Sequence, residues 1–88
     1  MSHYFFHIQD GSNVLEDPDG QECNNLADAQ SEAIASAREL MAEDLRAGKP
    51  LGLHRAIVIA NENGAVLTEV SFQAALPSEI AKRRASEV

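Results

Sequence analysis

The chain has 88 residues, 44% of them hydrophobic, and carries a formal net charge of −7. A chain of this length builds one hydrophobic core, which excludes two domains, and its apolar content excludes a disordered protein. Residues 1–78 contain twelve of the fourteen acidic residues but only four of the seven lysines and arginines. This balance disfavours a nucleic-acid partner, because phosphate binding depends on lysine and arginine.

Cysteine usage and the N-terminal sequence indicate where the protein resides. Cys23 is the only cysteine, so no intramolecular disulfide can form, and this is typical of a reducing compartment. The first residues lack the basic and apolar regions of a signal peptide, and no apolar run reaches membrane-spanning length. We therefore expect a cytoplasmic protein that does not bind membranes.

The first 24 residues predict two strands and two turns. His3–Gln9 reads as a strand with alternating faces, and 10–13 reads as a turn because of its Asp, Gly, Ser and Asn. Val14–Glu16 is a short second strand. Residues 17–20, Asp-Pro-Asp-Gly, fit a type I turn, after which 21–24 return as extended chain.

A long helix is predicted over 26–47, which contains no Pro or Gly. Asn24 or Asn25 is placed to cap it, Gly48 fits the position after its end, and Pro50 prevents its continuation. Helical periodicity gathers the apolar side chains on one side, which indicates an amphipathic helix against a sheet. These are Leu26, Ala29, Ala33, Ile34, Ala37, Leu40, Met41 and Leu45. Asp44 falls within the same arc, in the last turn, where fraying or contact with Arg55 or Lys49 would compensate its charge.

Two further strands are predicted at 55–61 and 65–72. Asn61-Glu62-Asn63-Gly64 between them is a hairpin signal, with Gly64 able to take the left-handed position of a bulged turn. We therefore expect one α+β domain over residues 1–76, with 77–88 a tail that is partly helical or frayed.

The predicted architecture has two layers, with one long helix on one face of a three- to four-stranded, antiparallel-dominated sheet in the order β-β-α-β-β. The order of the strands within the sheet stays open. It also stays open whether Tyr4 and Phe6, or instead Phe5, face the helix.

The second face of the predicted sheet is more apolar than a solvent-exposed face should be. Phe5, Val58 and Leu67 all lie opposite their strands' other large apolar residues. One interpretation is a binding surface for a protein partner or a second copy of the chain, which makes the protein a non-enzymatic interaction module. The alternative is that the C-terminal segment folds over this face through Leu76 and Ile80.

A small enzyme or ligand or metal binder is the alternative function, with polar groups from His3, His7 and Asp10. Four residues along a strand separate the two histidines by about 13 Å, which is too far for one zinc ion to join them easily. Strand alternation also places Asp10 on the opposite face unless the turn intervenes. We predict no catalytic residue, metal or cofactor, and His54 joins this group only if its strand starts beside the first one.

Two other candidate sites fail on their residue patterns. Aligning Gly20 with the glycine of a calcium loop places Leu15 and Leu26 at ligand positions that need acids. Cys23 has no His near it in the sequence to serve as a base, so nothing marks it as a nucleophile. The acidic helix stripe is typical of a solvated face.

The opening Tyr4-Phe5-Phe6-His7, followed by Asp10-Gly11, resembles that of a bacterial family of small proteins known only as a domain of unknown function. The later Asp-x-x-Gly turn at 17–20 and the alanine-rich helix over 29–45 are similar too, as are the last strand and its Ala75-Leu76-Pro77 exit. The resemblance covers nearly the whole chain. It implies a stand-alone α+β domain and brings no substrate, cofactor or catalytic residue.

Overall fold

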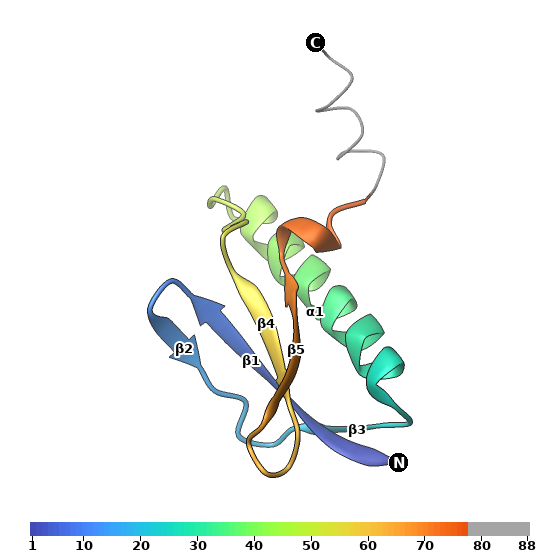
Figure 1. Ribbon diagram of the computed structural model, residues 1–88. Coiled ribbons are helices and arrows are strands. Elements are labelled where there is room, and N and C mark those ends of the chain that lie inside the picture. The colour runs from blue at the N-terminus through green and yellow to red at the C-terminus, as the bar shows by residue number, and fades with distance from the viewer. Residues whose placement is uncertain (78–88) are drawn as a thin grey trace.

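The computed structural model describes residues 1–77, in which one long helix crosses one face of a five-stranded antiparallel sheet (Figure 1). The elements are β1 (Ser2–Asp10), β2 (Asn13–Leu15), β3 (Gln21–Cys23), α1 (Leu26–Arg46), β4 (Ala56–Ala60), β5 (Val66–Ser71) and the short 3-10 helix η1 (Gln73–Ala75). The α+β class with one covering helix is thus confirmed. The sheet has one strand more than expected because Gln21–Cys23 pairs with the start of β1.

The strand order is β2-β1-β4-β5, and β3 also pairs with β1. Both β2 and β3 run antiparallel to β1, so the chain keeps its direction from one to the other. Residues 16–20 between them form an outward loop in one interrupted edge strand. The turn predicted at 17–20 therefore does not reverse the chain. Three residues of β1 face five residues of the edge strand, and the two extra ones bulge out.

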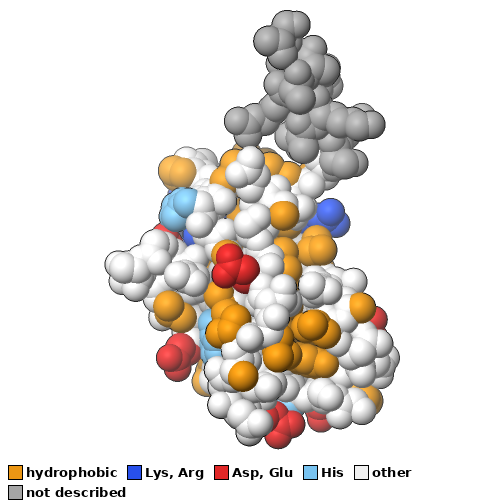
Figure 2. Space-filling model, viewed as in Figure 1, with side chains coloured by type: hydrophobic (Ala, Val, Ile, Leu, Met, Phe, Trp, Pro, Cys, Tyr) orange, Lys and Arg blue, Asp and Glu red, His pale blue; other side chains and the backbone are white. Residues whose placement is uncertain are grey.

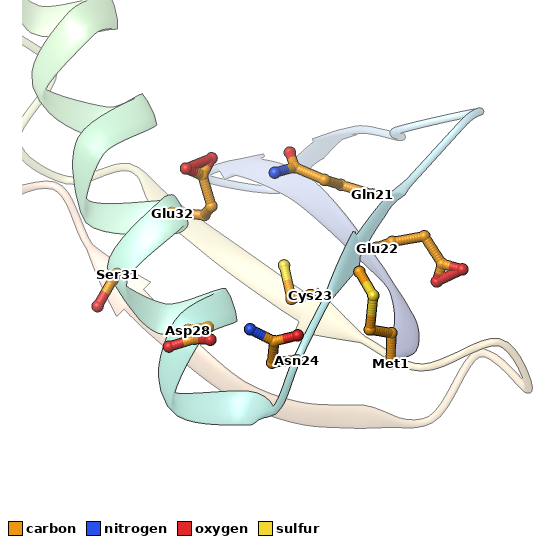
Figure 3. Close-up of a pocket in the computed structure, with 8 residues that line it drawn as sticks. All are labelled: Met1, Gln21, Glu22, Cys23, Asn24, Asp28, Ser31 and Glu32. Carbon is orange, nitrogen blue, oxygen red and sulfur yellow. The ribbon is translucent and has the colours of Figure 1, made fainter.

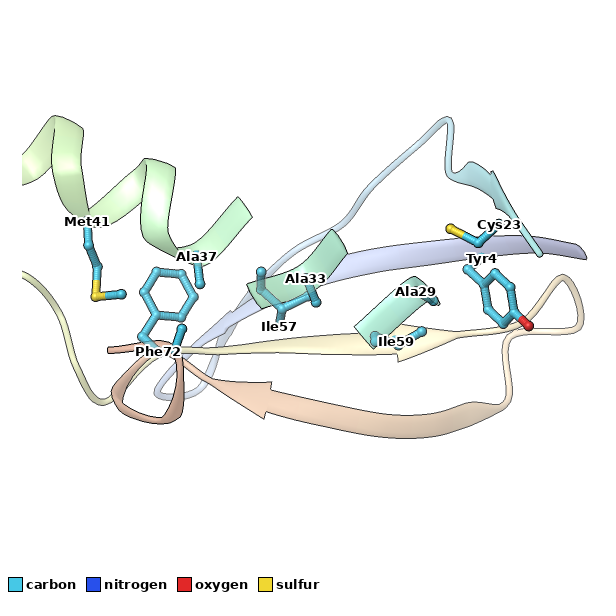
Figure 4. Packing of buried hydrophobic residues seen from close by; sticks show 10 residues of the cluster. Tyr4, Cys23, Ala29, Ala33, Ala37, Met41, Ile57, Ile59 and Phe72 are labelled. Atoms are coloured by element: carbon cyan, nitrogen blue, oxygen red, sulfur yellow. The ribbon is translucent and has the colours of Figure 1, made fainter. Parts of the chain in front are cut away.

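Tyr4, Phe6 and Ile8 are the residues of β1 that face the helix, and Phe5 lies on the other side. On the helix side, α1 buries Ala29, Ala33 and Ala37 completely. Figure 4 shows Ala29 and Ala33 over the isoleucines of β4 and Ala37 next to Phe72. Met41 and Phe72 lie at one end of the core and Tyr4 and Cys23 at the other. Small side chains bring the helix close to the sheet, so the isoleucines and Phe72 fill the remaining volume.

The two ends of α1 follow the capping signals in the sequence. The Asn25 side chain accepts a hydrogen bond of 2.9 Å from the Asp28 N–H, which satisfies one of the free donors of the first turn. After the helix, Gly48 has a φ of 72°, the left-handed conformation that favours glycine at this position.

Arg55 links the end of α1 to the sheet, which confirms the expectation that this cation compensates Asp44. Its guanidinium donates hydrogen bonds to the Asp44 carboxylate at 2.8 Å and to the carbonyls of Leu51 at 2.7 Å and Gly52 at 3.2 Å. It also lies 4.3 Å from the centre of the Phe72 ring. Four contacts on one planar group hold the loop before β4 against the helix.

The last turn of α1 departs from the predicted apolar side. Leu45 was expected in the core, but it is 69% exposed. Asp44 occupies the inward position there, where it pairs with Arg55, and the helical rotation leaves Leu45 facing outward.

The last described residues lie on the helix side of the sheet and pack against the core. After Phe72 and η1, Leu76 packs against the same cluster as Tyr4 and Phe6, and the Ala75 carbonyl accepts a 2.7 Å hydrogen bond from Arg38. The expectation that Leu76 covers the far face is therefore wrong. Ile80 and the predicted tail from residue 78 onward lie outside the described residues. Within residues 1–77, no helix combines the length and the apolar character needed to cross a membrane.

Candidate functional site: the outer face of the sheet

Three transverse rows of residues cross the sheet face that α1 does not cover, and we call this surface the outer face. Each row takes one residue from β1, one from β4 and one from β5, because directly opposed residues of paired strands point to the same face. The rows are Phe5–Ala60–Val66, His7–Val58–Glu69 and Gln9–Ala56–Ser71. The middle strand thus contributes only alanine and valine, and Glu69 is the one carboxylate of the three rows.

Hydrophobic side chains remain accessible around these rows. Val66 is 65% and Leu67 is 42% exposed, whereas Phe5 and Val58 are half-buried. The hydrophobic side chains that Figure 2 shows between β5 and α1 lie on the helix side of the sheet, around a groove lined by Ile34 and Val70, and are not part of the outer face. Large exposed aliphatic side chains on a protein of net charge −7 indicate a surface that another apolar surface can cover.

The predicted interface residues are only partly brought together. Phe5 and Val58 lie in neighbouring rows, but Leu67 lies in a bulge where the pairing of β4 with β5 shifts between Ile59 and Ala60. Val66 therefore takes the place opposite Ala60. Strict alternation could not reveal this, although the bulged turn predicted at Gly64, which has a φ of 83°, was the relevant signal.

The β1 side of the outer face carries a ladder of three rings. The rings of His3 and Phe5 meet edge to face with their centres 5.1 Å apart, and the rings of Phe5 and His7 are nearly parallel with their centres 6.3 Å apart. Contacts of this kind restrict the rotamers of all three side chains. The ladder is therefore a fixed surface, and the loop of residues 16–20 lies against it.

The loop of residues 16–20 is held by hydrogen bonds to this ladder and to β1. Asp17 accepts a hydrogen bond of 3.2 Å from the Phe6 N–H, and its own N–H donates to Nδ1 of His7 at 3.1 Å. Nε2 of His3 lies 2.7 Å from the Asp19 carbonyl oxygen and donates to it. Since Nδ1 of His7 accepts a hydrogen bond, the proton of the neutral ring is on Nε2.

The Asp17 carboxylate is stabilised in its charged form. Burial raises the pKa of Asp17, but hydrogen bonds from the N–H groups of Gly20, Phe6 and Asp19 and the nearby His7 outweigh it, so the pKa lies below its usual value. The group is therefore an ionised structural acceptor at neutral pH. It is poorly suited to act as a general acid there.

The residues of the alternative ligand site do not converge. His3 and His7 each use a ring nitrogen to hold the loop of residues 16–20, while Asp10 lies at the end of β1 and contacts Nε2 of His54 at 2.6 Å. Within residues 1–77, no group of three or more His, Cys, Asp and Glu side chains is arranged to hold a metal ion. His54 is a neighbour of Asp10 that sequence reasoning left undecided.

A separate cavity of about 360 Å³ lies between β3 and the first turns of α1 (Figure 3). Cys23 is one of the residues that line it and is 6% exposed. Burial raises the pKa of the Cys23 thiol, and the carboxylates of Glu32, Asp28 and Glu22 raise it further. Because the thiolate is the nucleophilic form, this environment disfavours covalent chemistry at Cys23.

Comparison with known proteins places most of the chain in one family. The family model described as "Domain of unknown function (DUF6894)" matches residues 3–73. This match includes β1 with its aromatic opening, the loop of residues 16–20, α1 and both strands of the second hairpin. No curated protein and no solved structure matches the chain.

Proposed function

The chain belongs to the DUF6894 family, whose description assigns no activity, and we propose that it acts as a non-enzymatic, self-associating module that uses its outer face. The observation that supports this is the composition of the outer face. Phe5, Val58 and Val66 lie in adjoining rows around small alanines, with a single carboxylate among the nine residues of the three rows.

The placement of charge supports the same proposal. On α1, four acids lie on the exposed side and Asp44 pairs with Arg55, so the helix places no carboxylate on the three rows. Asp17 and Asp19 lie next to the ladder on the β1 side, where His7 and His3 hold their loop. A surface depleted of like charge lets two acidic molecules approach each other without direct repulsion.

The polar groups nearby have structural roles that fit a binding surface better than a reactive one. His3 and His7 fix the loop of residues 16–20, and this loop in turn holds the rings beside Phe5 in place. A rigid surface loses little conformational entropy when it is covered, which favours association.

Val58→Asp tests the proposal because it places a charge at the centre of the outer face. We expect the associated species to become monomeric in sedimentation velocity, since a buried unpaired carboxylate strongly disfavours an apolar contact. Ala42→Asp, at an exposed position of α1, adds the same charge elsewhere and should leave the association unchanged. Association that persists equally in both variants would exclude the outer face.

A further inference from the structure

Building on the proposed self-association, we propose that two copies pack face to face around a two-fold axis that runs parallel to β4 over Val58. In this arrangement His7 of each copy donates a hydrogen bond to Glu69 of the other. The partner is therefore a second copy of this chain, in one defined orientation.

The middle row carries this inference because it is asymmetric about β4. The register places His7 of β1 on one side of Val58 and Glu69 of β5 on the other. A rotation by 180° about an axis along β4 exchanges the two sides, so each imidazole comes to lie over a carboxylate. An axis across the strands would instead place Glu69 over Glu69, where like charges repel.

The same rotation matches the two outer rows. Phe5 of one copy comes to lie over Val66 of the other, on either side of Ala60, which is already buried within each copy at 2% exposure, and Gln9 comes to lie over Ser71. Apolar groups thus meet apolar groups and polar groups meet polar groups in all three rows. Aligned packing of two sheets is a common arrangement, with a spacing of about 10 Å that interdigitated side chains fill.

The chemistry of the two side chains suits a direct contact. Nδ1 of His7 is occupied by the Asp17 N–H at 3.1 Å, so Nε2 carries the proton and can donate. Glu69 is exposed, and within residues 1–77 the structure gives its carboxylate no hydrogen bond or ion pair. A hydrogen bond to an ionised acceptor is among the stronger polar contacts at an interface.

Glu69→Lys in the full chain tests the cross-contact, with Glu43→Lys on the exposed side of α1 as the matched control. Both changes move the net charge from −7 to −5 and so reduce the general repulsion between copies equally. We expect Glu69→Lys to raise the dimer dissociation constant, measured by sedimentation equilibrium, by roughly tenfold or more, because it replaces two acceptors per dimer by donors. Glu43→Lys should leave the constant unchanged or lower it.

Cross-linking tests the position of the axis independently of charge. In a Cys23→Ser background, Val58→Cys places two thiols opposite each other on the axis, whereas Glu43→Cys places them on the outside. A short bis-maleimide linker should therefore join copies of the first variant and not of the second, with thermal unfolding used to verify that both are folded.

The outcomes separate this inference from the proposed function. Equal dissociation constants for the two lysine variants, or no cross-linking through position 58, would overturn the orientation while a dimer sensitive to Val58→Asp still supports the outer face. A chain that stays monomeric at the highest attainable concentration would overturn both.

Discussion

Asp17 takes the place of a strand partner at the point where β2 and β3 leave β1 unpaired. The bulge interrupts the hydrogen bonds of the sheet next to Phe6, and an unpaired N–H there would be costly. One oxygen of the Asp17 carboxylate accepts that N–H, and the other accepts the N–H groups of Asp19 and Gly20 at 3.2 and 3.1 Å. A single side chain thus closes the gap in the ladder and shapes the loop.

We expect Asp17→Asn to lower the free energy of unfolding at pH 7 by about 1–2 kcal/mol, because the amide can present only one acceptor where the carboxylate presents two. The folded-state pKa of Asp17 is lowered, so its stabilisation is complete above the unfolded value of about 3.9 and is lost as the pH falls through the folded value. Urea unfolding at pH 7 and below pH 4 measures both effects.

The Asp17→Asn variant should therefore lose less stability on acidification than the wild type does. Asp19→Asn is a suitable control because it lies in the same loop, and only its backbone, not its carboxylate, takes part in the hydrogen bonds described above. If both variants show the same acid dependence as the wild type, the role given to Asp17 is incorrect.

Arg55 is the second residue on which the fold depends strongly. We expect Arg55→Lys to destabilise the domain by about 2–3 kcal/mol, since an ammonium group cannot reach Asp44 and both loop carbonyls while lying flat on Phe72. Thermal or urea unfolding measures the loss. Arg46→Lys, at an exposed position in the last turn of α1, should change stability by less than about 0.5 kcal/mol.

At the scale of elements, the loop of residues 16–20 determines how the edge strand passes β1. Gly20 has a φ of 69°, and a Cβ atom built on it would lie 2.6 Å from Nε2 of His3 and 2.8 Å from the Tyr4 carbonyl oxygen. The backbone conformation and the close approach to β1 both require glycine here. The glycine of the Asp-x-x-Gly turn therefore packs directly against His3 and Tyr4 at the start of β1.

Gly20→Ala should destabilise the protein by about 2–3 kcal/mol, which combines the cost of the left-handed conformation with the displacement of His3. Gly48→Ala is the matched control, because Gly48 has a φ of 72° but no atom within 4 Å of its Cβ position, so only about 1 kcal/mol is expected. If urea unfolding shows the same loss of unfolding free energy for both variants, the contact of Gly20 with β1 contributes nothing to stability.

The loop of residues 16–20 also shows where sequence reasoning reached its limit. Composition and turn chemistry located the helix, its caps, both halves of the second hairpin and the existence of this loop. They could not show that the chain continues in the same direction after Gly20, because that depends on β3 finding the start of β1 as its partner. Local signals specify the conformation of a turn, whereas tertiary pairing decides what the turn connects.

At the scale of the whole molecule, the assignment of faces was the main question that periodicity left open. Phe5 and Phe6 are adjacent and equally apolar, so either could have faced the helix. The alanines of α1 resolve this only in three dimensions, where Phe6 and Tyr4 fill the space beside them and leave Phe5 outside. Of the three residues predicted for the second face, Phe5 and Val58 lie in the rows and Leu67 does not, because the three-row arrangement depends on the registers of β4 with its neighbours.

The pairing of β1 with β4 also has a consequence for synthesis on the ribosome. The residues Phe5–Gln9 find their partners only at 56–60, so a nascent chain carries this aromatic strand without the middle of the sheet until residues 56–60 have been synthesised. Long-range pairing of this kind closes slowly, and an unpaired aromatic strand is prone to aggregate or to bind chaperones meanwhile. Early pairing with β2, through a turn of two residues, gives the emerging segment its first protection.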